Sequence, residues 1–199
     1  MEKKMVLVIG GARSGKSTFA QRKAEESGRR VCYVATAEAR DGEMDERISH
    51  HRRARPAGWL TLELEGGTVL NGLPASAGLA LLDCFTVYLS NLMATKGLDW
   101  PVEEEDLMAE EEVLRLMEEC EGEAMHMVER MHEEAETTII VSNEVGMGVV
   151  PPYRLGRIFR DLAGRLNQRL AERADEVYLV VAGLHILVKG GRGGELGDT

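Results

Sequence analysis

Residues 10–17 read Gly-Gly-Ala-Arg-Ser-Gly-Lys-Ser, and they match the phosphate-binding loop pattern Gly-x-x-x-x-Gly-Lys-Ser/Thr in full. The loop also stands in the context that this pattern requires. An apolar run at residues 5–9 predicts a buried strand before the loop, and residues 18–26 have the pattern of a helix after it. A chance glycine-rich turn, the alternative, does not explain both flanking elements. The chain is therefore expected to fold around a nucleotide phosphate site.

Each position of this loop has a physical role in holding phosphate. Gly10 and Gly15 allow a tight turn whose amides point at phosphate oxygens, and the following helix adds its N-terminal dipole. Lys16 carries a positive charge to the β- and γ-phosphates, and the Ser17 hydroxyl can bind Mg²⁺. We predict a catalytic role for Lys16 and nucleotide contacts from Gly10, Gly11, Ala12, Arg13, Ser14, Gly15, Lys16 and Ser17.

Four further apolar runs resemble the strand before the loop. They are short, lie at residues 31–35, 79–82, 137–141 and 177–181, and have helical patterns between several of them. Strands that are apolar on both faces and separated by helices predict a mostly parallel sheet with helices on both faces. We expect an α/β fold with one catalytic domain over residues 1–189 and a flexible glycine-rich tail over 190–199.

Polar residues at the ends of three predicted strands are further candidates. Asp83 ends an apolar strand, and a carboxylate there can hold Mg²⁺ together with Ser17. Ligands of open α/β sheets bind at the carboxyl ends of strands, a rule that also nominates Ala35-Thr36-Ala37 and Ser142-Asn143-Glu144. For these two segments, ordinary turn chemistry is an equal alternative.

Two long helices are predicted, and they carry opposite charges. Residues 102–135 place apolar side chains at three- and four-residue steps among glutamates, with a potential break at Gly122. This acidic face is interpreted as a solvated surface. Residues 153–173 have a leucine stripe with six arginines lying off it. That basic face can meet phosphates, a neighbouring subunit or only solvent, and the sequence leaves the three open.

A short helix is predicted over residues 41–53, and it contains two adjacent histidines. Met44, Ile48 and His51 fall on one face at i, i+4 and i+7, whereas His50 is displaced by about 100°. His51 is thus expected to point inward or into a cleft. Beside a nucleotide site and flanked by arginines, it can act as a nucleophile toward phosphorus. A hydrogen-bonded core histidine is the alternative, and the spacing alone favours it.

Composition narrows the function class. The net charge is −10, and 15 of the acidic residues lie within 103–136. An acidic chain without a basic tract argues against nucleic acid as the partner. Three cysteines without a Cys-x-x-Cys pair predict reduced thiols in a cytoplasmic protein. The apolar run near the N-terminus is too short to span a membrane. A small anionic ligand is the expected partner.

Several segments together resemble one family, the bifunctional adenosylcobinamide kinase/adenosylcobinamide-phosphate guanylyltransferases. The most distinctive is Val-Ser-Asn-Glu-Val-Gly-Met-Gly-Val-Val-Pro at 141–151. The others are the 10–17 loop, Tyr33–Ala37, Glu43-Met44, Arg47-Ile48, His50-His51, Arg55-Pro56, Trp59, Arg160-Asp161, Ala163–Arg165, Asn167-Gln168 and Ala174-Asp175. The resemblance covers residues 6–181, apart from the acidic helix, and the segment 183–189 keeps the family's closing strand only loosely.

This resemblance implies a RecA-like fold, a homotrimer and two reactions. The first phosphorylates the aminopropanol arm of adenosylcobinamide, and the second transfers GMP from GTP to that phosphate through a GMP-histidine. GTP and ATP would be substrates and Mg²⁺ the cofactor. The resemblance places the GMP on the histidine pair, and the helix face selects His51. It also adds His50, Arg52, Arg53 and Glu63 to the predicted nucleotide-binding residues.

Other functions remain compatible with the phosphate loop alone. A kinase of another small alcohol would need the loop but not His51. A GTP-binding module without catalysis commonly reads guanine with Asn-Lys-x-Asp, a sequence that this chain lacks. A RecA-type motor on nucleic acid is disfavoured by the charge and the small size.

Overall fold

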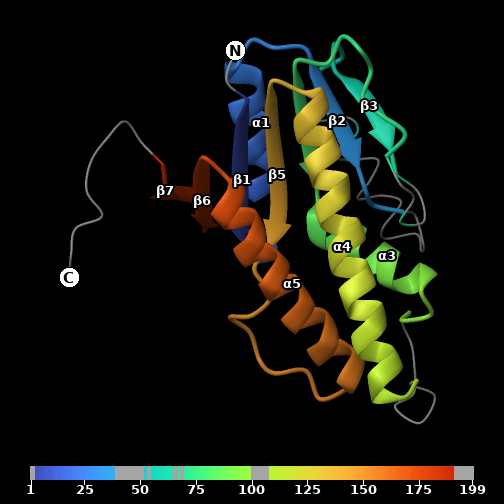
Figure 1. Ribbon diagram of the computed structural model, residues 1–199. Helices are drawn as coiled ribbons and strands as arrows, with labels where there is room; N and C mark the ends of the chain where they lie inside the picture. Colours follow the sequence, from blue (N-terminus) through green and yellow to red (C-terminus); the bar gives the residue numbers. More distant parts are fainter. Residues whose placement is uncertain are drawn as a thin grey trace.

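The computed structural model describes residues 3–38, 52, 55–64, 67, 70–99 and 108–190. They form a seven-stranded sheet in the order β3-β2-β4-β5-β1-β6-β7 (Figure 1). All neighbouring strands pair in parallel except β7, which runs antiparallel to β6. The strands are β1 (Lys4–Gly10), β2 (Val31–Ala35), β3 (Leu60–Glu63), β4 (Leu79–Asp83), β5 (Thr137–Asn143), β6 (Glu176–Val181) and β7 (Leu184–Lys189).

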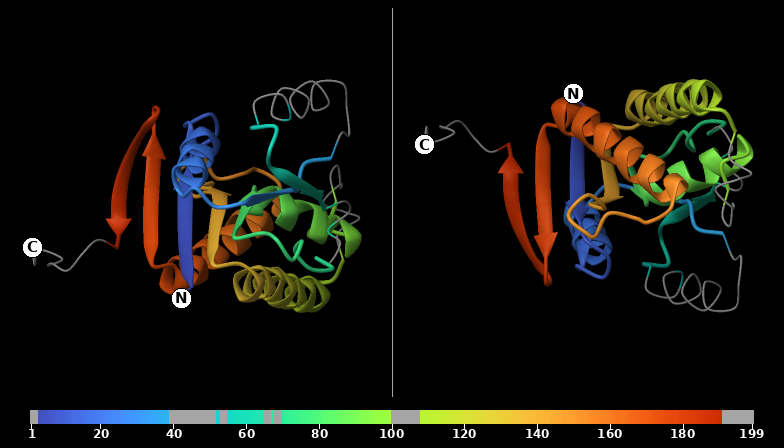
Figure 2. Two further views of the ribbon diagram at one scale, coloured as in Figure 1. Left: turned by 90° about the horizontal axis from the view of Figure 1, so that it is seen from above. Right: turned by 90° about the horizontal axis from the view of Figure 1, so that it is seen from below.

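Helices cover both faces of this sheet. Helix α1 (Lys16–Glu26) lies on one face, and α3 (Phe85–Thr95), α4 (Glu110–Glu134) and α5 (Arg154–Arg173) lie on the other (Figure 2). Successive side chains of each central strand enter two separate cores, so that Leu82 packs with α3–α5 and Leu81 packs with α1. The predicted α/β fold, a mostly parallel sheet with helices on both faces, is confirmed.

The arginine face of α5 meets the acidic helix α4, an arrangement that the sequence did not predict. Arg165 and Arg169 both pair with Glu121, at 3.3 and 2.8 Å, and Arg173 pairs with Glu129 at 2.9 Å. Part of each charged face is therefore neutralised within the chain.

Helix α4 also differs from its predicted bounds, since it begins at Glu110 and runs without a break through Gly122. The buried residues Cys120 and Ala124 flank this glycine. Packing on both sides outweighs the cost of about 1 kcal/mol for a glycine inside a helix.

Candidate nucleotide-binding site

The loop between β1 and α1 needs glycine at two positions for different reasons. A Cβ on Gly10 would lie 2.4 Å from the carbonyl oxygen of Val180 and 2.7 Å from Ser14 Oγ. Gly15 has a φ of 95°, a left-handed conformation that side chains disfavour. A Cβ on Gly11 would meet no atom within 4 Å. The tight turn predicted from the sequence is thus present.

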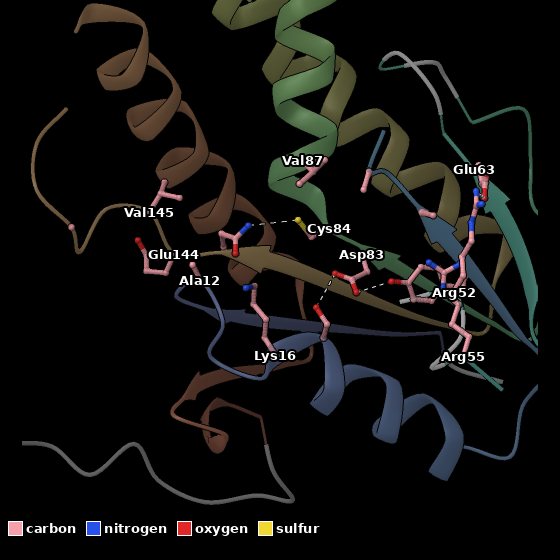
Figure 3. Close-up of a pocket in the computed structure, with 16 residues that line it drawn as sticks. Ala12, Lys16, Arg52, Arg55, Glu63, Asp83, Cys84, Val87, Glu144 and Val145 are labelled. Carbon is pink, nitrogen blue, oxygen red and sulfur yellow. Dashed lines mark hydrogen bonds and ion pairs between the residues drawn. The ribbon is translucent and has the colours of Figure 1, made fainter. Parts of the chain in front are cut away.

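Lys16, Ser17 and Asp83 converge at the start of α1. Lys16 is only 8% exposed, and its Nζ donates a hydrogen bond to the carbonyl oxygen of Gly11 at 3.1 Å. Ser17 Oγ donates to Asp83 Oδ1 at 3.1 Å (Figure 3). This hydroxyl and carboxylate supply two hard oxygen donors side by side, which fits Mg²⁺ bound together with nucleotide phosphates.

Tyr33, at the centre of β2, holds the other oxygen of the same carboxylate. Its hydroxyl donates to Asp83 Oδ2 at 2.7 Å. Burial of the ring, and then the negative charge of Asp83, raise the pKa of Tyr33 well above its usual value. The hydroxyl therefore stays protonated and keeps Asp83 turned toward Ser17.

Arg55 lies over the face of the Tyr33 ring. The guanidinium carbon lies 3.7 Å from the centre of the tyrosine ring, in a cation–π contact. Arg55 Nε and the loop's Ser14 Oγ are both buried and lack a hydrogen-bond partner among the described residues. Buried polar groups are normally satisfied, so these two atoms favour a bound polar ligand.

These side chains border a cavity of about 580 Å³ at the carboxyl ends of the strands. At one end lie Lys16 and Glu144, and at the other Arg52 forms an ion pair with Glu63 (Figure 3). The lining residues are Ala12, Lys16, Ser17, Tyr33, Ala35, Ala37, Arg52, Arg55, Glu63, Asp83, Cys84, Val87, Asn143, Glu144, Val145 and Gly148.

Thr36, which the sequence also nominated, has a buried side chain that joins two strand ends. Its Oγ1 accepts a hydrogen bond from the amide of Cys84 and donates one to the carbonyl oxygen of the same residue, both at 2.9 Å. Asn91 Nδ2 donates to the carbonyl oxygen of Thr36 at 2.9 Å. The contacts of Thr36 hold the ends of β2 and β4 together.

The end of β5 is held in a similar way. Asn143 Nδ2 donates to Thr86 Oγ1 at 2.6 Å, and Asn167 Nδ2 donates to the carbonyl oxygen of Asn143 at 3.1 Å.

Burial of the Cys84 thiol, and then the negative charge of Asp83, raise the pKa of that thiol. The thiol therefore stays neutral beside the carboxylate.

The family model for cobinamide kinase/cobinamide phosphate guanyltransferase matches residues 6–188. The chain belongs to this family. The bifunctional adenosylcobalamin biosynthesis protein CobP of Pseudomonas aeruginosa is 44% identical over 186 residues, which cover 92% of this chain and 96% of the relative. The CobU proteins of Salmonella typhimurium and Escherichia coli are 40% and 39% identical, each over 93% of this chain and 99% of the relative.

Among solved structures, the RadB recombinase is 14% identical, with a TM-score of 0.44 and coverage of 95% of this chain and 82% of that one. As a member of the cobinamide kinase/cobinamide phosphate guanyltransferase family, the chain is a transferase.

Of the predicted site residues, the structure brings Ala12, Lys16, Ser17, Ala35, Ala37, Arg52, Glu63 and Asp83 to one cavity. His50, His51 and Arg53 lie outside the described residues. Tyr33 was missed, since a tyrosine inside an apolar run resembles a core residue. The contact depends on the register of β2 and β4, in which Tyr33 pairs with Leu81, two residues before Asp83.

Proposed function

We propose that this chain phosphorylates adenosylcobinamide and then transfers GMP from GTP to adenosylcobinamide phosphate. The main support for this proposal is that Lys16, Ser17 and Asp83 line one cavity in a chain that belongs to this family. The names of the relatives, which describe bifunctional proteins of adenosylcobalamin biosynthesis, support both activities. ATP and GTP are the proposed nucleotide substrates.

In the phosphorylation step, the loop binds the nucleotide phosphates. Loop amides and Lys16 neutralise the charge that develops on the transferred phosphoryl group. Ser17 and Asp83 would hold Mg²⁺, which would supply positive charge to the nucleotide phosphates. Tyr33 orients Asp83 for this contact through its 2.7 Å hydrogen bond.

In the guanylyl transfer, the proposed nucleophile is His51. Its ring nitrogen attacks the α-phosphorus of GTP, a nitrogen–phosphorus bond forms, and the bond to the departing pyrophosphate breaks. The phosphate of adenosylcobinamide phosphate then displaces the histidine and gives adenosylcobinamide-GDP. Arg52 and Arg55, which line the cavity, are placed to balance phosphate charge.

The proposal is tested by incubating the protein with α-labelled GTP and Mg²⁺. We expect GMP attached to the protein in an acid-labile linkage, which adenosylcobinamide phosphate discharges as adenosylcobinamide-GDP. A kinase of another small alcohol or a GTP-binding module would form no such adduct. Absence of the adduct at full nucleotide occupancy would contradict the guanylyl half of the proposal.

We further propose a homotrimer, as the resemblance implies. The exposed apolar residues of the edge strand β7 support a contact with a second chain, because long apolar edges are normally covered. These residues are Leu184, Ile186, Leu187 and Val188. Sedimentation equilibrium tests the proposal, and a fully active monomer of 21.9 kDa would contradict it.

The proposed location is the cytoplasm, which fits the free thiols of Cys32, Cys84 and Cys120. Among the helices that the structure describes, none has the length and apolar character needed to cross a membrane.

A further inference from the structure

Glu144, the first residue after β5, is a carboxylate that the proposed function leaves without a role. Its backbone amide donates to the carbonyl oxygen of Gly10 at 2.9 Å, so it lies directly beside the phosphate-binding loop. It lines the same cavity as Lys16. Figure 3 shows Glu144 beside Ala12, at the Lys16 end of the cavity. Glu144 therefore lies at the end of the cavity where Lys16 would contact the β- and γ-phosphates of a nucleotide.

Three carboxylates line this cavity among the described residues: Glu63, Asp83 and Glu144. The side chains of the first two are held by other side chains of the cavity. Asp83 accepts hydrogen bonds from Ser17 and Tyr33. Glu63 forms its ion pair with Arg52 at the opposite end (Figure 3). Glu144 is thus the remaining carboxylate of this cavity, and its backbone bond to Gly10 places it beside the loop.

Phosphorylation of an alcohol needs a group that takes the hydroxyl proton. As the acceptor oxygen bonds to the γ-phosphorus, its O–H bond must break and the proton must go to a base. In protein kinases an aspartate has this position. A carboxylate that lies beside the loop and lines the same cavity can do the same.

The surface next to Glu144 suits a bulky acceptor. Val145 and Gly148 line the cavity, and the apolar residues Met147 and Val149 beyond them are 81% and 94% exposed. Exposed apolar side chains at the mouth of a cavity commonly mark a contact with ligand or partner. An acceptor with a large apolar body and a short hydroxyl-bearing arm would place its arm at Glu144.

We infer that Glu144 is the general base for the phosphorylation half of the proposed function. Its carboxylate accepts the proton of the acceptor hydroxyl, the new oxygen–phosphorus bond forms, and the bond to the nucleoside diphosphate breaks. The inference rests on the proposed function, but it concerns only the kinase half. Guanylyl transfer from a histidine to a phosphate has no hydroxyl proton to remove, so it does not need Glu144.

The variant Glu144→Gln isolates the charge from the local structure. In this structure Glu144 Oε1 accepts a hydrogen bond from the amide of Gly146 at 2.9 Å. A glutamine carbonyl oxygen can accept the same bond, so the turn is retained while the base is lost. The matched control is Glu118→Gln, because Glu118 is exposed on α4 and remote from the cavity.

The experiment measures two reactions on each variant: phosphorylation of adenosylcobinamide, and conversion of supplied adenosylcobinamide phosphate to the GDP product. We expect Glu144→Gln to lower kcat of phosphorylation by roughly 10²-fold or more, the scale of general-base catalysis. The KM for nucleotide and the second reaction should stay within about twofold of wild type. Glu144→Asp should recover part of the rate, because it restores a carboxylate. Glu118→Gln should leave both reactions unchanged.

Two results would overturn the inference. One is a phosphorylation rate of Glu144→Gln within threefold of wild type, which means that another group takes the proton. The other is an equal loss of both reactions, which means that Glu144 acts only by shaping the loop. A wild-type protein that performs neither reaction would instead contradict the proposed function, so the two failures are distinguishable.

Discussion

Gly10→Ala should distort the phosphate-binding loop, whereas Gly11→Ala, one residue later, should not. An added methyl at Gly10 would lie 2.4 Å from the carbonyl oxygen of Val180, where ordinary contact begins at 3.4 Å. The loop and β6 must therefore separate by about 1 Å. Val180 cannot yield easily, because it is fully buried and pairs with β1 along the parallel ladder.

The expected cost follows from this overlap with rigid backbone. Overpacking a well-packed site costs about 1–3 kcal/mol, and contact with backbone rather than a flexible side chain favours the upper half of that range. For a domain of this size, roughly 2–3 kcal/mol lowers Tm by about 4–12 °C. A methyl at Gly11 meets nothing, and neither glycine has a left-handed φ that would itself require glycine. Gly11→Ala should therefore change Tm by less than about 2 °C.

Thermal unfolding followed by circular dichroism, without nucleotide, measures both variants against wild type. The pair is matched, since the same methyl group is added one residue apart. Equal melting temperatures for the two variants would refute the steric account of Gly10. A lower Tm for Gly11→Ala alone would mean that the loop is built differently.

Other predictions concern the chemistry. Lys16→Ala should lower nucleotide-dependent turnover by at least about 10²-fold with the fold intact, because a charge that stabilises the phosphoryl group is lost; wild-type turnover with GTP would exclude this role. Asp83→Asn should lower the rate more than nucleotide affinity and weaken the Mg²⁺ dependence, and an unchanged metal titration would remove Asp83 from the site. His51→Ala should abolish GMP labelling from α-labelled GTP and spare phosphorylation, which needs no covalent histidine, whereas His50→Ala should retain labelling. The opposite pattern of labelling would refute the helix-face argument.

Some features of the site were predictable because they depend on neighbouring residues. The turn at residues 10–15 requires glycines at set spacings, and the following helix begins at Lys16. Asp83 was predictable as a strand end, since an apolar run gives way there to a carboxylate. Continuous apolar runs at residues 5–9, 79–82 and 137–141 were sufficient for the central strands, which are buried on both faces.

Short or peripheral elements were not predicted from the residue pattern, although the family resemblance pointed to a closing strand at residues 183–189. Strand β3 has four residues with alternating half-buried and exposed side chains, too few for a distinct pattern. Helix α3 is apolar around most of its surface because it is buried between the sheet and α4, so it lacks the one-sided stripe that identifies a surface helix. The antiparallel partner β7 is exposed along its whole length.

The sequence by itself determined that the chain has a phosphate-binding loop inside a parallel α/β fold. Only the tertiary structure decided which distant side chains reach that loop. Strand order puts β5 between β1 and β4, and the register aligns Gly10 with Asn143, which brings Glu144 beside the loop. The same packing brings Tyr33 to Asp83 and the arginines of α5 to the glutamates of α4. Such contacts join residues tens of positions apart, and local periodicity carries no information about how strands are ordered in space.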